Sequence, residues 1–271
     1  KKAGGVTRSH LRFGPSPIKS TYYIANADFL SCSLDEYCFK YDMIRYLKEG
    51  GTFLLNTSFP VDELEKHLPN RLLASLAKKH AKFFVIDATK IAQEIGMGRR
   101  TNTILQSAFF ALNEQTMTYD KAVKLMKYMA KKSYSKKGDD IVQLNYVAID
   151  KGKDGLVEVP VKPEWAELTY DANKKTGDAY FDEHVCAIND LNGYDLPVSH
   201  FTKYGLEDGS IKNGYSFKEK RTIAVQVPKW NPENCIQCNF CSMVCPHGTI
   251  RPVLLTEEEI KQDCERKAFI R

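Results

Sequence analysis

Residues 82–92 read KFFVIDATKIA, and this stretch predicts a buried strand that continues through a turn into a helix. Its four consecutive apolar residues, Phe83 to Ile86, suit a strand of a parallel sheet that is covered on both faces. Two earlier runs have the same character: ADFL at 27–30, which we expect to be buried, and TFLLNTS at 52–58. Short strands that alternate with helices predict an α/β fold, here a three-layer α/β/α domain with a mostly parallel sheet.

Apolar residues at helical spacing predict the layers that cover this sheet. The stretch 34–51 predicts an amphipathic helix that is closed by Gly50 and Gly51, because glycine commonly follows a helix end. Thr101 and Thr118 are candidate N-caps of two later helices. Further helices are expected at 68–80, 101–114 and 118–133.

The composition is that of an ordinary globular protein. Of its 271 residues, 43% are hydrophobic and 27% are charged, and the formal net charge is +5. Lysine pairs lie at expected helix ends, where solvent and the helix dipole account for them, so no nucleic-acid partner is expected. No apolar run reaches the roughly 18 residues of a membrane helix, and no signal peptide opens the chain, which predicts a cytoplasmic protein without a membrane partner. The chain lacks an initiator Met, and we expect it to be a fragment.

Four of the eight cysteines lie close together in CIQCNFCSMVCP at 235–246. Without a secretory signal, such thiols are expected to bind metal. The spacing C-x2-C-x2-C-x3-C-P is that of ferredoxins with two clusters, in which the fourth cysteine binds the other cluster. We therefore expect Cys235, Cys238 and Cys241 to bind one [4Fe–4S] cluster and Cys245 to bind a second. Apolar neighbours such as Phe240 are expected to cover it.

Zinc is the competing metal for this motif. Structural zinc sites usually combine two separated pairs of ligands, and no second pair is present here. His247 is a conceivable ligand, but a histidine in this position is more often incidental. After Cys245 the chain holds only Cys264, in the polar stretch QDCERK, which makes a poor ligand. We therefore expect only half of a two-cluster module. Cysteines outside the motif are interpreted as buried or incidental thiols: Cys32, Cys38, Cys186 and Cys264.

The region between the two predicted domains is rich in proline and turn residues. VEVPVKPEWAEL at 157–168 is expected to be extended, and TIAVQVPKW at 222–230 predicts a short strand. We read it as a connector with a small β-element. The predicted organisation is an α/β domain at 1–155, a connector at 156–229 and a partial ferredoxin-like domain at 230–271.

Several long blocks resemble one enzyme family. GGVTRSHLRFG at 4–14, IGMGRRTNTILQSAFFAL at 95–112 and YSKKGDDIVQLNYVAID at 134–150 look like the γ domain of pyruvate:ferredoxin (flavodoxin) oxidoreductase. The stretch from 219 to 256 resembles the connector and the first half of the ferredoxin-like domain of the same enzyme. The blocks keep the family's order over nearly the whole chain. The resemblance implies an internal segment of a larger polypeptide, without the Gly-rich loop that normally opens the γ domain.

The resemblance also implies a reaction. Pyruvate is decarboxylated oxidatively with coenzyme A to acetyl-CoA and CO2, and [4Fe–4S] clusters pass the electrons to ferredoxin or flavodoxin. Thiamine diphosphate and Mg2+ bind outside this segment, so no catalytic residue is expected here, and the isolated segment should be inactive. The implied partners are the remaining domains and a second copy in a homodimer. The location would be cytoplasmic, or hydrogenosomal in an anaerobic protist.

In the family the γ domain helps to bind coenzyme A. By position, the matching contacts are Lys2, Asn102 and Asn145. A lysine can meet a phosphate, and asparagine amides can bind ribose, amide or phosphate oxygens. The alternative explanation for each asparagine is a local cap or turn. Arg99 stands where the family usually has glycine, which adds a cation or alters the local backbone.

Two alternatives remain open at this point. One is another 2-oxoacid:ferredoxin oxidoreductase, although such enzymes commonly divide these domains among separate subunits. The other is a free-standing iron–sulfur electron carrier, for which a complete second cysteine motif would be expected.

Overall fold

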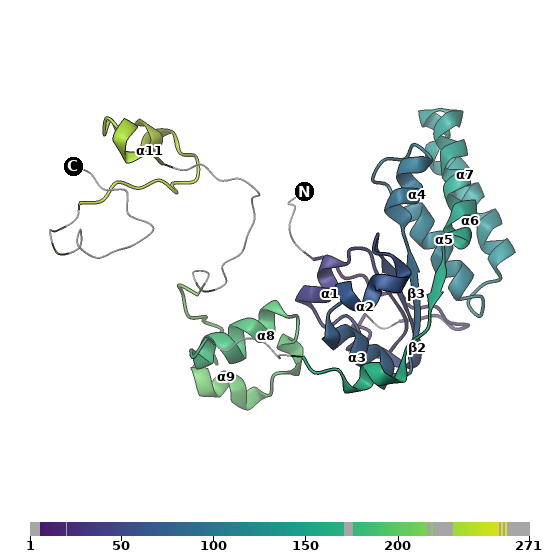
Figure 1. The fold of residues 1–271 in the computed structure, drawn as a ribbon, viewed down its shortest axis with the longest axis horizontal. Coiled ribbons are helices and arrows are strands. Elements are labelled where there is room, and N and C mark those ends of the chain that lie inside the picture. Colours follow the sequence, from purple (N-terminus) through teal and green to yellow (C-terminus); the bar gives the residue numbers. More distant parts are fainter. Residues whose placement is uncertain are drawn as a thin grey trace. The chain divides into compact units, whose positions relative to one another are not determined.

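The computed structural model describes residues 6–19, 21–170, 176–215, 218, 230–254, 256 and 258. It divides into two units, Gly5–Lys218 and Glu219–Arg271 with Lys1–Gly4, and each unit is described by itself (Figure 1). The expected coenzyme A contact Lys2, the poor ligand Cys264 and the expected strand up to residue 229 lie outside the described residues. In the part that is described, no helix is long and apolar enough to cross a membrane.

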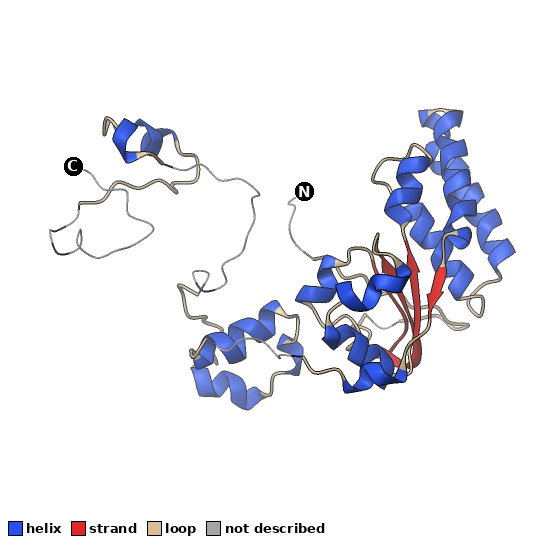
Figure 2. Cartoon of the chain, viewed as in Figure 1, coloured by secondary structure: helices blue, strands red, loops and turns tan. Residues whose placement is uncertain are grey.

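The larger unit is built on a four-stranded sheet (Figure 2). Its strands are β1 (Ala27–Cys32), β2 (Leu47–Asn56), β3 (Lys82–Ile86) and β4 (Val157–Val159), and they lie in that order across the sheet. The first three strands are parallel and β4 is antiparallel to β3. The α/β class and the mostly parallel sheet are therefore confirmed.

Helices cover both faces of this sheet, as the apolar runs predicted. In β2, Phe53 and Leu55 face one core and Leu54 faces the other, as the alternation of side chains along a strand requires. The first core includes α1 (Glu36–Lys40), α2 (Leu64–His67) and α3 (Asn70–Lys78). The second includes α4 (Ala88–Glu94), α5 (Asn102–Leu112) and α7 (Asp139–Asp154) (Figure 1). The three-layer α/β/α arrangement is confirmed.

The second layer is thickened by α6 (Tyr119–Tyr134), which packs on α7 through Met126, Ala130 and Ile149. Close contact between α5 and α7 depends on Gly152. A Cβ atom at this position would lie 2.6 Å from the carbonyl oxygen of Ile104 and 2.6 Å from Cβ of Ser107. The Ser107 hydroxyl donates a hydrogen bond of 2.5 Å to the carbonyl of Ile149.

The predicted helix at 34–51 is wrong. Only α1 forms there, and residues 47–51 belong to β2. Gly50 has a φ of +69°, which a strand tolerates at this irregular point but an α-helix does not. The ammonium group of Lys79 holds the turn before β2 by donating to the carbonyls of Ile44, Arg45 and Leu47.

Two other expectations need correction. Residues 27–30 are not fully buried, because β1 is an edge strand: Asp28 is exposed, and Phe29 and Leu30 are half-buried. The long helix α7 was not predicted at all. The expected N-caps Thr101 and Thr118 do precede α5 and α6, but neither side chain makes a capping hydrogen bond.

The expected connector begins within the first unit. β4 completes the sheet, and a 3-10 turn (Pro163–Glu167) buries Trp165 in the first core. From residue 176 onward the described part of the connector is helical, with a π-helical turn (Phe181–Val185), α8 (Cys186–Asn189) and α9 (Val198–Tyr204). The division at residue 155 remains a prediction.

Candidate metal centre and ligand-contact residues

The cysteine motif forms a short loop that leads into α11 (Phe240–Val244). Two residues between the cysteines, Gln237 and Asn239, have left-handed backbone, with φ of +58° and +62°. Side chains other than glycine adopt this conformation rarely, so the loop is held in an unusual shape. It brings the backbone N–H of Gln237 toward the sulfur of Cys235, with an N to Sγ distance of 3.4 Å.

Cys245 follows α11 and also receives backbone hydrogen bonds. The N–H of Thr249 donates to its Sγ at 3.3 Å. The backbone N–H groups of Ile250, His247 and Thr249 lower the pKa of the Cys245 thiol to about 7. Since donors to the sulfur favour the thiolate, this cysteine is well suited to bind a metal.

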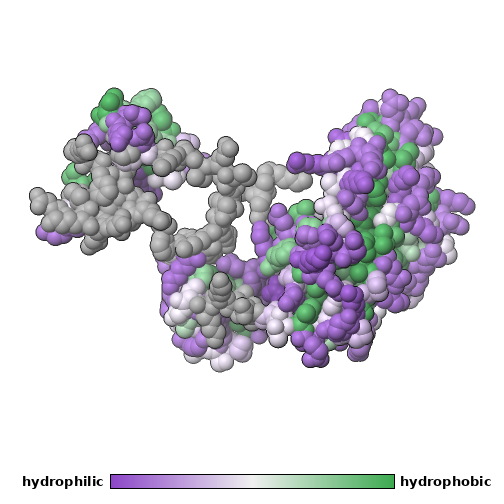
Figure 3. Space-filling view, in the orientation of Figure 1, coloured by the Kyte–Doolittle hydropathy of each residue, from purple (hydrophilic) through white to green (hydrophobic). Residues whose placement is uncertain are grey.

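The four thiols fit iron–sulfur ligation by their chemistry. They are soft ligands at ferredoxin spacing, and the sulfurs of Cys235 and Cys245 accept backbone N–H donors, as sulfurs that bind clusters do. Cys238 and Cys241 are exposed, and no three metal-binding side chains converge among the residues that the structure describes. Neighbouring apolar side chains also face solvent in the described part of this unit (Figure 3), and they are Ile236, Phe240, Met243, Val244, Val253 and Leu254.

The two asparagines expected to contact coenzyme A lie on neighbouring helices. Asn102 is the first residue of α5 and is exposed. Asn145 lies in α7 and is buried, with 3% of its surface exposed. The Thr103 hydroxyl donates to the Asn145 side-chain oxygen at 3.1 Å, and the Asn145 amide donates to the carbonyl of Ile141 at 2.8 Å. Because Thr103 follows Asn102 directly, the structure brings both asparagines to the contact between α5 and α7.

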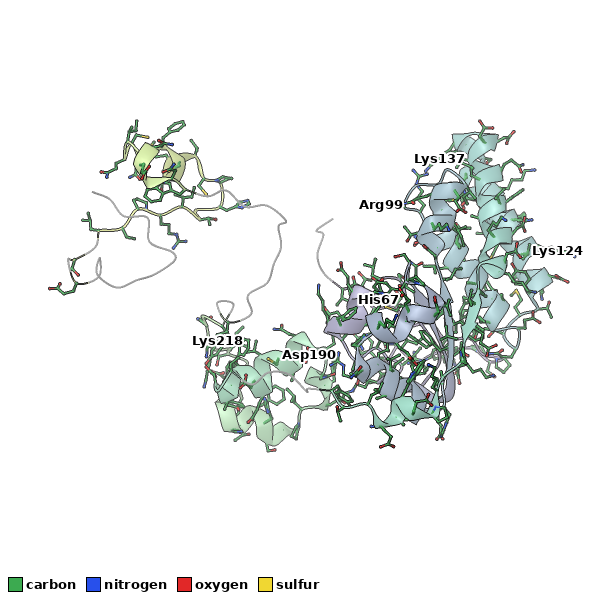
Figure 4. The ribbon with its side chains drawn as sticks, viewed as in Figure 1. His67, Arg99, Lys124, Lys137, Asp190 and Lys218 are labelled. Carbon is green, nitrogen blue, oxygen red and sulfur yellow. The ribbon has the colours of Figure 1, made fainter. Side chains whose placement is uncertain are left out.

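The loop before α5 combines special backbone with two cations. Gly96 and Gly98 have φ of +81° and +63°, a conformation that glycine allows without strain. Arg99 and Arg100 are exposed next to the start of α5. Figure 4 places Arg99 toward the upper end of the helical layer in that view. Arg99 in the glycine position therefore adds a positive charge near Asn102.

A groove beside Asn145 was not anticipated from the sequence. Its volume is 290 Å³, and it runs between α5 and α6, which make few contacts with each other. Most of its lining is apolar, and Thr103 and Asn145 supply polar atoms. Three methionines contribute to the lining, namely Met117, Met126 and Met129. Met126 and Met129 lie on α6, and Met117 precedes that helix by two residues.

The model of the family "Pyruvate ferredoxin/flavodoxin oxidoreductase" matches residues 1–155 of this chain, which include the whole parallel part of the sheet. The chain belongs to this family. A second model, "4Fe-4S binding domain", matches residues 227–250 of the same oxidoreductase chain and includes all four clustered cysteines.

Curated relatives support this family assignment. Pyruvate:ferredoxin oxidoreductase of Moorella thermoacetica is 45% identical over 94% of this chain and 21% of its own length. Pyruvate-flavodoxin oxidoreductase of Enterobacter agglomerans is 43% identical over 96% of this chain and 22% of its length. The mitochondrial pyruvate dehydrogenase [NADP(+)] of Euglena gracilis is 38% identical over 96% of this chain and 14% of its length. The chain spans about a fifth of the length of the first two relatives.

Proposed function

We propose that this chain is a segment of an enzyme that oxidatively decarboxylates pyruvate with coenzyme A to acetyl-CoA and CO2. The observation that carries the proposal is the presence, in one chain, of the oxidoreductase domain and of a [4Fe–4S] motif. Ferredoxin or flavodoxin is the proposed electron acceptor, in line with the names of the relatives. The proposed setting is cytoplasmic, where the cysteine thiols stay reduced before they bind iron.

The role of the C-terminal unit in this proposal is electron transfer. Cys235, Cys238 and Cys241 would hold one cluster, and Cys245 would help to hold the next. A bound [4Fe–4S] cluster accepts and releases one electron at a time at low potential. The N–H groups of Gln237 and Thr249 donate to cysteine sulfurs, and with a cluster bound they would raise its potential by stabilising the added negative charge.

The role of the α/β unit is to contact coenzyme A. Asn102 offers an exposed amide beside Arg99 and Arg100, and the first N–H groups of α5 favour an anion. Asn145 uses one amide proton within α7 and accepts one bond from Thr103, so a second proton remains for a ligand in the adjoining groove. Lys2, outside the described residues, is the third proposed contact.

The rest of the proposed machinery lies beyond this segment. Thiamine diphosphate and Mg2+ would bind to other domains of the parent polypeptide, which would act as a homodimer. No residue of this chain is assigned to decarboxylation, and the isolated segment is expected to have no turnover.

The test is an anaerobic assay of the parent enzyme, with the 2-oxoacid, coenzyme A and acceptor each omitted in turn. We expect reduction of ferredoxin or flavodoxin only when pyruvate and coenzyme A are both present, and much slower reduction with 2-oxoglutarate. Faster turnover of 2-oxoglutarate or a branched 2-oxoacid would contradict the proposed substrate. Reduction of NADP+ without added ferredoxin or flavodoxin would contradict the proposed acceptor.

A further inference from the structure

The groove between α5 and α6 changes in character along its length. At one end Thr103 and Asn145 supply polar atoms, and the hydrogen bond between them holds both side chains in place. At the other end the lining is apolar and includes Met126 and Ile149, which belong to the same apolar cluster. A ligand that fits this groove must therefore combine an apolar body with a polar edge.

The size and the lining of the groove favour a flat aromatic ring. Its volume of 290 Å³ is at the lower limit of small-molecule sites, which usually measure roughly 300–1,000 Å³. It therefore holds one part of a molecule such as coenzyme A and not the whole of it. Methionine side chains such as Met129 adapt to the shape of a ligand, and their sulfur atoms make favourable contacts with aromatic rings. Phe110 adds an aromatic ring of its own to the lining.

Two carboxamide groups can bind the edge of such a ring. The Asn145 amide donates one proton to the carbonyl of Ile141 at 2.8 Å, so its second proton is available to the groove. Gln106 is an exposed residue of α5 that also lines the groove, and its side chain carries both donors and an acceptor. Asparagine and glutamine amides match the N6 and N7 edge of adenine, which offers one donor and one acceptor.

Cations lie at the polar end of the groove. Tyr134 belongs to the lining, and the ammonium group of Lys137 lies 5.6 Å from the centre of its ring. Arg99 and Arg100 come just before α5, whose second residue is Thr103. Figure 4 places Arg99 and Lys137 toward the same, upper end of the helical layer. An anionic group attached to the bound ring would therefore meet these cations and the first N–H groups of α5.

We propose that this groove binds the adenine ring of coenzyme A. Gln106 and Asn145 bind the edge of the ring, and the cations at the polar end hold the phosphates. The inference rests on the proposed function and specifies which part of coenzyme A the α/β unit holds. The thiol lies at the opposite end of coenzyme A from the adenine, so it stays outside the groove and free to react at another domain. A pantetheine arm in the groove would instead bury the thiol at the apolar end.

Photolabelling of the full-length enzyme tests where the ring binds. The probe is 8-azidoadenosine 3′,5′-bisphosphate, which carries the adenine and phosphates but no pantetheine. After irradiation and digestion with trypsin, we expect label in peptide 101–121, which contains Gln106 and Phe110, or in peptide 128–131, which contains Met129. An excess of coenzyme A should prevent the labelling. Label confined to other peptides, or labelling that coenzyme A does not reduce, would overturn the proposal.

Two variants at exposed lining positions, Gln106→Ala and Met129→Glu, test the contribution of the groove to affinity. Gln143→Ala and Tyr128→Glu are the matched controls, at exposed positions outside the lining. Calorimetry with the full-length enzyme gives the Kd of adenosine 3′,5′-bisphosphate. We expect this Kd to rise about tenfold in each groove variant, because a hydrogen bond is lost or a carboxylate is added beside the phosphates, and to stay unchanged in the controls. The Kd of 4′-phosphopantetheine should not change in Gln106→Ala.

The possible outcomes separate this inference from the proposed function. Unchanged affinity for the bisphosphate in both groove variants would overturn the inference. A Gln106→Ala variant that binds 4′-phosphopantetheine more weakly, and the bisphosphate as well as the wild type does, would overturn it in favour of the pantetheine arm. Neither binding measurement needs turnover. Wild-type enzyme that reduces its acceptor without coenzyme A would contradict the proposed function, and the turnover assay detects that separately.

Discussion

The Thr103 hydroxyl donates a hydrogen bond of 3.1 Å to the side-chain oxygen of Asn145, and this bond joins α5 to α7. It lies directly beside Asn102, the exposed first residue of α5. Of the two asparagines proposed to contact coenzyme A, Asn145 is thus part of the internal hydrogen bonding of the domain, whereas Asn102 is open to solvent. The two asparagines should therefore differ in their effect on stability.

Asn145→Ala should destabilise the α5–α7 contact by about 1–3 kcal/mol, because it removes the partner of Thr103 and a second hydrogen bond to Ile141. Hydrogen exchange of α5 and α7 in the full-length protein measures this as a lower free energy of opening. Asn102→Ala is the matched control and should change that free energy by less than about 0.5 kcal/mol. Equal losses in both variants would contradict the assignment.

Asn102→Ala should instead weaken the use of coenzyme A. Loss of one hydrogen bond to a charged ligand corresponds to roughly a tenfold rise in the KM for coenzyme A, with kcat changed little. Gln93→Ala, on the exposed end of the preceding helix α4, is the control and should behave as the wild type. Steady-state kinetics of the full-length enzyme at saturating pyruvate provide the measurement. An unchanged KM for Asn102→Ala would remove this residue from the proposed site.

Gly152→Ala separates helix propensity from packing. Propensity alone predicts that alanine in the last turn of α7 stabilises the protein by up to about 1 kcal/mol. The methyl group would, however, meet Ile104 and Ser107 at 2.6 Å, so we expect a net loss of about 1–3 kcal/mol. Lys151→Ala, at an exposed neighbouring position, should change stability little. Denaturant unfolding or hydrogen exchange gives the sign, and a stabilised Gly152→Ala would contradict the close contact of α5 and α7.

The histidine pair of the connector should make this region sensitive to acid. His184 Nδ1 lies 3.1 Å from His200 Nε2 in a buried contact, and burial, together with His200, lowers the pKa of His184 below its ordinary value of 6.5. The unfolded segment then binds protons more readily than the folded one. The free energy of unfolding of this segment is therefore highest well above pH 6.5, and it decreases as the pH falls below that value.

Hydrogen exchange of residues 180–204, corrected for the intrinsic effect of pH, checks this expectation. Protection should fall on acidification in the wild type, and it should fall less in His184→Gln. His67→Gln, at a half-exposed histidine that stacks on Phe59, is the control and should keep the wild-type response. A pH response that is the same in the wild type and His184→Gln would rule out this explanation.

The sequence predicts best those elements whose own pattern decides them. Four apolar residues at 83–86 were sufficient for β3, and the leucines of α3 for a covering helix. The helix predicted at residues 34–51 was wrong because the apolar residues of this stretch also fit a helical period. The irregular pairing of β1 with β2 and the bonds from Lys79 decide that segment, and both depend on distant parts of the chain.

The candidate site residues also differ in how far the sequence alone predicts them. The four clustered cysteines lie within eleven consecutive residues, so their spacing alone predicts that they bind a cluster. Asn102 and Asn145 were selected only through resemblance to a family. Cys32 and Cys38 were interpreted as buried or incidental thiols, and both are buried in the first core.

The central claim is that the cysteine motif holds iron–sulfur clusters within the parent enzyme. Counting iron and acid-labile sulfide in the anaerobic full-length protein and in Cys238→Ala tests it most directly. We expect equal amounts of iron and sulfide in the wild type, about four fewer of each per chain in Cys238→Ala, and no loss in the control His247→Gln. Zinc without labile sulfide in the wild type, or an iron content that Cys238→Ala leaves unchanged, would contradict the account.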